Sequence, residues 1–175
     1  MVSNSPTTLQ RTLAVVMVLL LYAPNRNGVA AQAADFGFRF EVGDCPAERF
    51  DTFSGVFTKD LGGEVARTVT ARMSLTDAQM MAIYSAVEHI RFFDYPSTFD
   101  GVPTGVQEVT TTIPYSTYHF EVRNAGVVHT VSWKDASKPT TAEADRLRDL
   151  FAMVLGLIHE HPAFKRLPPA IGGCE

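Results

Sequence analysis

The sequence is that of an acidic chain whose length suits one domain. Its 175 residues are 46% hydrophobic and include 15 Lys and Arg against 19 Asp and Glu, for a net charge of −4. This balance argues against a nucleic-acid binder, whose affinity depends largely on cations that contact phosphates, and against docking on an anionic membrane surface.

The first predicted element is a secretory signal peptide. Arg11 precedes an unbroken apolar run over 13–21, and small residues follow in the segment 31–33, where a signal peptidase would cleave. The run has about half of the roughly 20 apolar residues that a membrane-spanning helix requires. We therefore expect residues 1–33 to be removed and residues 34–175 to form one secreted or periplasmic domain with no stable membrane span. A retained membrane anchor is the alternative.

The two cysteines, Cys45 and Cys174, lie near the two ends of the predicted domain. In an oxidising compartment such a pair is expected to form a structural disulfide. Neither cysteine belongs to a Cys-x-x-Cys motif, and Asp44 would disfavour a reactive thiolate at its neighbour. Unpaired or intermolecular thiols, a redox site and a metal site are the alternatives.

Three strands are predicted in the first third of the domain. The segment 36–42 alternates aromatic or β-branched residues with small or charged ones, as a half-buried strand does. A second strand is predicted over 50–59 and a third over 65–73, after a turn at 61–63. These strands would form an antiparallel meander.

A helix is predicted to follow from Ser74 or Thr76. Thr76 and Gln79 have the spacing of a capping box, and the apolar residues recur at helical spacing. The helix should end near 91–93, because the following Asp-Tyr-Pro cannot continue it. These apolar residues are Met80, Ile83, Tyr84, Val87 and Ile90.

The middle of the chain predicts a long loop and then a hairpin. Residues 97–107 contain glycine and proline without periodicity, and an edge strand over 108–113 would be interrupted by Pro114. Strands over 115–123 and 127–133 would then pair through a turn at 124–126.

The last predicted element is a helix over 141–160. Thr140 and Glu143 suggest a second capping box, and Pro162 ends the helix. The prediction for the whole domain is an α+β fold, an antiparallel sheet of about five strands with two amphipathic helices packed on one face.

The loop over 97–107 and the neighbouring sheet edge are the predicted binding site. Apolar residues in a long loop of a compact domain often serve recognition, although here they could simply pack over the sheet edge. The candidate binding residues are Tyr95, Phe99, Val102, Val106, Tyr115 and Trp133. The predicted function is non-enzymatic binding of a protein or another envelope component, without a cofactor. A purely structural envelope component is a further alternative.

A small hydrolase or metal-dependent enzyme is the alternative of another class. His119, Glu121 and His129 would share one hairpin face if a three-residue turn set the strand pairing, and such a set suits acid–base chemistry or part of a metal site. His159 and His161 lie two residues apart, which points their rings in different directions on a helix. We therefore predict no metal site there, and no motif predicts a catalytic residue.

The order of several short strings resembles small exported bacterial domains of unknown function. Cys-Pro at 45–46 is followed by MSLTDAQMMAIYSAVEHIRFFDYP, then by YHFEVRNAGVVHTVSW, and finally by ADRLRDLFAMVLGLI. The resemblance implies an envelope or extracellular setting. It implies no catalytic residue.

Overall fold

The computed structural model describes residues 35–43, 47–63 and 67–171. The predicted signal peptide and both cysteines, Cys45 and Cys174, lie outside these ranges. Among the helices of the described residues, none is both long and apolar enough to cross a membrane.

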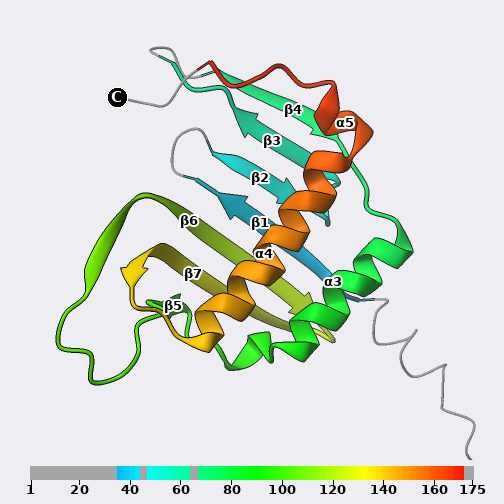
Figure 1. Ribbon diagram of the computed structural model, residues 1–175. Coiled ribbons are helices and arrows are strands. Elements are labelled where there is room, and N and C mark those ends of the chain that lie inside the picture. Colours follow the sequence, from blue (N-terminus) through cyan, green and yellow to red (C-terminus); the bar gives the residue numbers. More distant parts are fainter. Residues whose placement is uncertain (1–34, 44–46, 64–66, 172–175) are drawn as a thin grey trace, which may run out of the picture.

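One sheet of seven strands forms the centre of the fold (Figure 1). Its order is β4-β3-β2-β1-β6-β7-β5, and all neighbours are antiparallel except the parallel pair β5 and β7. The α+β class and the mainly antiparallel sheet are thus confirmed, but the sheet is larger than the predicted one of about five strands. The strands are β1 (Gly37–Val42), β2 (Glu48–Asp51), β3 (Val56–Asp60), β4 (Thr68–Arg72), β5 (Thr98–Phe99), β6 (Thr110–Asn124) and β7 (Val127–Lys138).

The predicted single strand over 50–59 is instead the hairpin of β2 and β3. The carboxylate of Asp51 accepts hydrogen bonds from the backbone N–H groups of Phe53 and Ser54, at 2.8 and 3.3 Å. Gly55 then has a positive φ of 63°, which a residue without a Cβ adopts at little steric cost. The chain therefore reverses direction where an unbroken strand was predicted.

The predicted loop over 97–107 contains a strand, β5, which forms one edge of the sheet beside β7. The backbone N–H of Ser132 donates to the carbonyl of Ser97 at 2.9 Å, and β5 runs parallel to β7 from there. Further along, the carbonyl of Gly101 accepts from the backbone N–H of Thr141 at 2.9 Å. The loop is thus fixed both to the sheet and to the start of the last helix.

The helices begin at capping residues close to the predicted ones. In α3 (Asp77–His89), Thr76 and Gln79 form the predicted capping box. In α4 (Ala142–Glu160), the N-cap is Thr141, whose hydroxyl accepts from the N–H of Ala144. The third helical residue is therefore an alanine, which has no side-chain acceptor, so the predicted second capping box is wrong. A 3₁₀ turn, η2 (Phe92–Asp94), follows α3, and a short α5 (Pro162–Lys165) follows α4.

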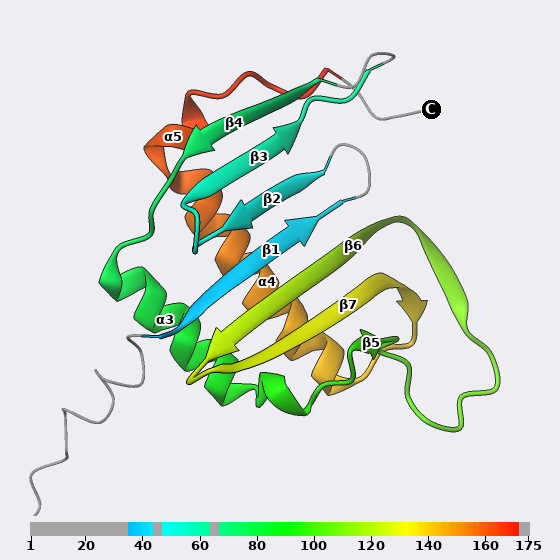
Figure 2. The same cartoon turned by 180° about the vertical axis from the view of Figure 1, so that it is seen from behind.

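The core lies between one face of the sheet and the helices α3 and α4, which cover that face (Figure 1). Aromatic side chains fill it, and Phe151 of α4 is at their centre, with ring centroids 5.3 Å from Phe40, 5.6 Å from Phe120 and 4.7 Å from Tyr118. No helix of the described residues covers the other face, which is in front in Figure 2. We call this second face the open face.

The C-terminal segment returns to the chain directly after β3, near the β4 edge of the sheet. The backbone N–H of Ile171 donates to the carbonyl of Leu61 at 2.6 Å. The adjacent Asp60 donates its N–H to the carbonyl of Ala47 at 2.8 Å. Ala47, near the beginning of the predicted domain, and Ile171, near its end, are therefore hydrogen-bonded to neighbouring residues, Asp60 and Leu61.

Candidate functional site

The hairpin of β6 and β7 turns through two residues, Ala125 and Gly126, which both have positive φ. In this register Val122 faces His129, and Glu121 faces Thr130. Because side chains alternate across a strand, the one-residue difference from a three-residue turn sends His129 to the opposite face from Glu121.

The predicted cluster of His119, Glu121 and His129 is therefore not formed. The ring of His129 packs against Phe92, at 5.6 Å between centroids, and its Nε2 is 2.9 Å from the carbonyl oxygen of Tyr95. His119 lies on the open face, with its Nδ1 3.0 Å from the hydroxyl oxygen of Ser132. The alternative of an enzyme built on these three residues loses its geometric basis.

The two histidines at the C-terminal end of α4 also have structural partners. The Nε2 of His159 is 2.7 Å from a carboxylate oxygen of Glu48, and its ring stacks on Phe164 with centroids 4.4 Å apart. The Nδ1 of His161 accepts from the backbone N–H of Ala163 at 3.1 Å. Within the described ranges, no group of three or more His, Cys, Asp or Glu residues is arranged to hold a metal ion.

Three of the predicted binding residues pack against one another. Phe99 lies between Tyr95 and Trp133, with ring centroids 5.3 and 5.4 Å away. Tyr95 and Trp133 are 7% and 2% exposed, and the hydroxyl of Tyr95 donates to the carbonyl of Glu143 at 2.9 Å. These contacts close the core beside β5, as the packing alternative for the loop predicts.

The remaining predicted residues lie along a more exposed stretch. Val102 and Val106 are half-buried, and the side chain of Tyr115 is 37% exposed. Beside them are two apolar residues that the sequence analysis did not single out, Val109 at 47% and Ile113 at 81% exposure. We call residues 109–115 the β6 arm.

The backbone of the β6 arm is largely outside the ladder. Between the pairs of Thr111 with Ser137 and of Ser116 with Asp135 the register shifts, so the intervening β6 residues have no partner on β7. On its other side, β6 begins to pair with β1 only at Tyr118. The arm thus presents apolar side chains, and its segment 112–115 has no ladder partner among the residues that the structure describes.

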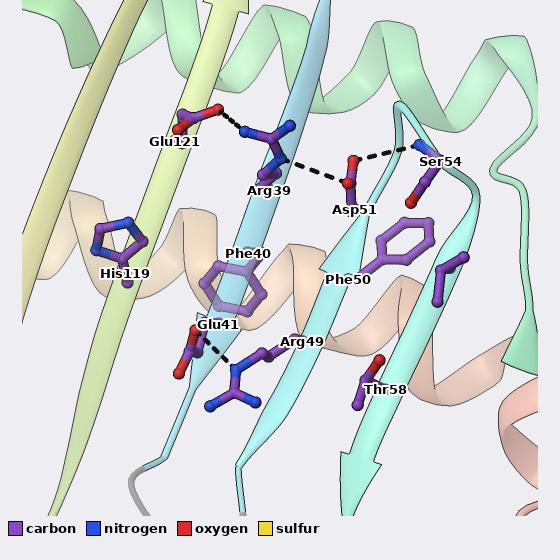
Figure 3. Close-up of a pocket in the computed structure, with 11 residues that line it drawn as sticks. Arg39, Phe40, Glu41, Arg49, Phe50, Asp51, Ser54, Thr58, His119 and Glu121 are labelled. Carbon is purple, nitrogen blue, oxygen red and sulfur yellow. Dashed lines mark hydrogen bonds and ion pairs between the residues drawn. The ribbon is translucent and has the colours of Figure 1, made fainter. Parts of the chain in front are cut away.

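A cavity of about 410 Å³ lies on the open face, over β1, β2, β3 and β6 (Figure 3). Its polar lining comes from side chains that alternate along each strand with the core phenylalanines. Val56 adds an apolar side chain, and Phe40 and Phe50 border the cavity although their rings lie in the core on the other face. The polar lining residues are Arg39, Glu41, Arg49, Asp51, Ser54, Thr58, His119 and Glu121.

Ion pairs connect the strands across this cavity. Arg39 reaches Asp51 with Nε at 3.4 Å and Glu121 with Nη1 at 2.8 Å. Arg49 pairs through Nε with Glu41 at 2.9 Å, and the hydrogen bond to this carboxylate raises the pKa of Arg49. Burial acts to raise the pKa of Asp51, but its hydrogen bonds with Phe53, Ser54 and Arg39 together lower it.

The sequence contains a signal for this cavity in the alternation of its strands β1 and β2. Arg39 and Glu41 alternate with the core residues of β1, and Arg49 and Asp51 flank Phe50 in β2. The pattern shows that these four charges share a face. It does not show that they pair, because the pairing depends on the register between two strands.

Comparison with protein-family models and with curated proteins gives no match to this chain. The resemblance to small exported bacterial domains accordingly stays a prediction. The geometry of the two surfaces, the β6 arm and the open-face cavity, is what supports the proposals below.

Proposed function

We propose that this protein is an exported, non-enzymatic binding module that holds an extended segment of a partner protein along the β6 arm. The observation that carries the proposal is the 81% exposure of Ile113 on a strand segment whose neighbours have no ladder partner. A large β-branched side chain so exposed is stabilised when a partner covers it.

Strand addition is the binding mode that fits the arm. In this mode the main chain of an extended peptide pairs with free strand backbone, and alternate side chains of the peptide supply specificity. The arm offers the backbone carbonyls of 112–115, the backbone N–H groups of this segment except at Pro114, which has none, and the apolar side chains of Val109, Ile113 and Tyr115. It therefore combines both requirements in one short segment.

The charges beside the arm favour an acidic partner. Lys134 lies over the ring of Tyr115, with Nζ 4.4 Å from the centroid, and Lys138 pairs in register with Thr110. Glu108 and Asp135 are the acidic residues nearby, but Asp135 is paired with Arg148 of α4 at 2.6 Å, which leaves Glu108 as the carboxylate that opposes the two lysines. An extended segment with alternating apolar and acidic residues complements this surface.

Titration of the purified domain with two labelled octapeptides tests the proposal. One peptide alternates Val with Glu, the other alternates Val with Lys, and fluorescence anisotropy reports their binding. We expect the acidic peptide to bind more tightly, and the substitution Ile113→Ser to weaken this binding about tenfold, because a central apolar contact is lost.

Val128→Ser is the matched control, because Val128 is 55% exposed at the opposite end of the same hairpin. It removes a similar apolar side chain without touching the arm, so its binding should equal that of the wild type. Equal affinity for both peptides, or equal losses in both variants, would contradict the proposal.

A further inference from the structure

We propose that the open-face cavity is a second, independent binding site, and that its ligand is a neutral saccharide bound through vicinal hydroxyl groups. The site lies on β1, β2, β3 and β6 (Figure 3), and none of its polar lining residues belongs to the β6 arm. Its volume of about 410 Å³ is within the range of small-molecule sites.

The charges of the cavity largely cancel, which favours an uncharged ligand. Two guanidinium groups, those of Arg39 and Arg49, stand among three carboxylates, those of Glu41, Asp51 and Glu121. Each guanidinium already has a carboxylate partner at 2.8 to 2.9 Å. An anionic ligand would be repelled by these carboxylates, and a cationic ligand would be repelled by the two guanidinium groups.

The ion pairs orient the guanidinium and carboxylate groups, and the atoms of these groups that do not take part in the pairs can bind a ligand. Arg49 makes its pair through Nε, so its two terminal nitrogens are directed away from Glu41 (Figure 3). Glu121 makes its pair through Oε1 and Glu41 through Oε2. The cavity thus presents N–H donors and carboxylate acceptors side by side, already held in place by their cross-strand partners.

A hydroxyl group matches this alternation because it both donates and accepts. Two hydroxyls on adjacent carbons can accept from the two N–H groups of one guanidinium, or donate to the two oxygens of one carboxylate, as planar bidentate groups require. Val56 of β3 adds an apolar side chain for the C–H groups of a sugar ring, whereas the rings of Phe40 and Phe50 lie in the core on the other face. Donors, acceptors and an apolar side chain therefore occur together in one cavity.

The experiment uses saturation-transfer difference and amide chemical-shift NMR on the whole domain without its leader. The probes are cellobiose, maltose and N,N′-diacetylchitobiose, with glucose 6-phosphate and glucosamine as charged counterparts. We expect at least one neutral disaccharide to bind and to shift amides of β1, β2 and β6. A neutral ligand should also bind with less than about twofold change between about 50 mM and about 500 mM salt.

Arg49→Met is the test variant and Arg146→Met the matched control. Both arginines are exposed and pair with a glutamate, but Arg146 pairs with Glu143 on α4, away from the open face. We expect Arg49→Met to weaken saccharide binding about tenfold or more and Arg146→Met to leave it unchanged. Glu121→Gln, which keeps the shape of the side chain, is the second variant if Arg49→Met does not fold.

Comparison of glucose, the disaccharides and the insoluble polymers cellulose and chitin separates a free sugar from a polymer as the source of the ligand. No binding of any neutral saccharide by the folded protein would overturn the inference. Tighter binding of the charged sugars, or equal losses in Arg49→Met and Arg146→Met, would overturn it as well. None of these outcomes bears on the β6 arm, whose test uses other residues and other probes.

Discussion

At the scale of single residues, Asp51 links the open face to the turn between β2 and β3. Its carboxylate accepts from the backbone of Phe53 and Ser54 and pairs with Arg39. The folded-state pKa of Asp51 lies below its ordinary value of 3.8. A group with a lowered pKa stabilises the fold above the unfolded-state value, and this contribution is lost as the pH falls through the folded-state value.

The substitution Asp51→Asn should therefore cost stability at neutral pH, by about 1 kcal/mol, and less at acid pH. We expect urea unfolding to show the gap between wild type and variant narrowing as the pH falls from about 6 to about 3. Asp149→Asn is the control, since Asp149 is an exposed residue of α4. A gap that stays constant with pH would contradict the assigned role of the carboxylate.

At the scale of elements, the turn of the β6–β7 hairpin uses a residue poorly suited to its backbone. Ala125 has a φ of +50° and is followed by Gly126 at +78°. A left-handed backbone costs an L-residue with a Cβ roughly 1–2 kcal/mol, and Asn is better tolerated there, so Asn-Gly is the preferred pair in such two-residue turns.

We therefore expect Ala125→Asn to raise the melting temperature, with a gain of about 0.5–1 kcal/mol in the free energy of unfolding. The same change at Ala78, an exposed residue in the first turn of α3, should lower the melting temperature, because Asn has a lower helix propensity than Ala. Calorimetry of both variants checks the pair. An equal decrease in both would show that the turn conformation imposes no such preference.

The elements that sequence predicts well are those with local signals. The alternation around Phe38 and Phe40 located β1, and Thr76 with Gln79 located the start of α3, because period and capping depend on a few successive residues. The hydrophobic pattern predicts one strand over 50–59 rather than two. It does not show that the carboxylate of Asp51 accepts hydrogen bonds that stabilise a turn there.

The candidate sites depended on longer-range pairing and were predicted only in part. The face of the hairpin on which His129 lies depends on the length of the turn, which the sequence does not determine. The two-residue turn of the structure places His129 beside Tyr95. The loop was recognised as a candidate, but Tyr95 and Trp133 are core residues and the most exposed apolar residue nearby is Ile113. Burial of an aromatic side chain depends on which helix covers it, and a single sequence does not contain that fact.

At the scale of the whole molecule, export and a disulfide between Cys45 and Cys174 remain our proposals. The described residues support the disulfide, because Ala47 and Ile171 are hydrogen-bonded to the successive residues Asp60 and Leu61. Closure of such a long loop would stabilise the fold by roughly 5 kcal/mol in the chain-entropy description.

Intact-mass spectrometry of protein from the natural producer tests both proposals together. We expect a chain that begins near residue 34 and whose mass falls short of the fully reduced form by two hydrogens. The same protein after reduction and alkylation is the control, because it should then carry two labels. A chain with its leader attached and both thiols free would contradict export and the disulfide alike.

The pairing of β1 with β6 has a consequence for how the chain acquires its structure. Residues 37–42 must meet residues 118–123 in the middle of the sheet, so the two halves of the sheet join across a long stretch of sequence. Contacts of this kind incur a large loop-closure entropy and slow folding relative to local pairing. During synthesis the N-terminal strands β1 to β4 are made first, and the sheet can be completed only after β6 has followed them.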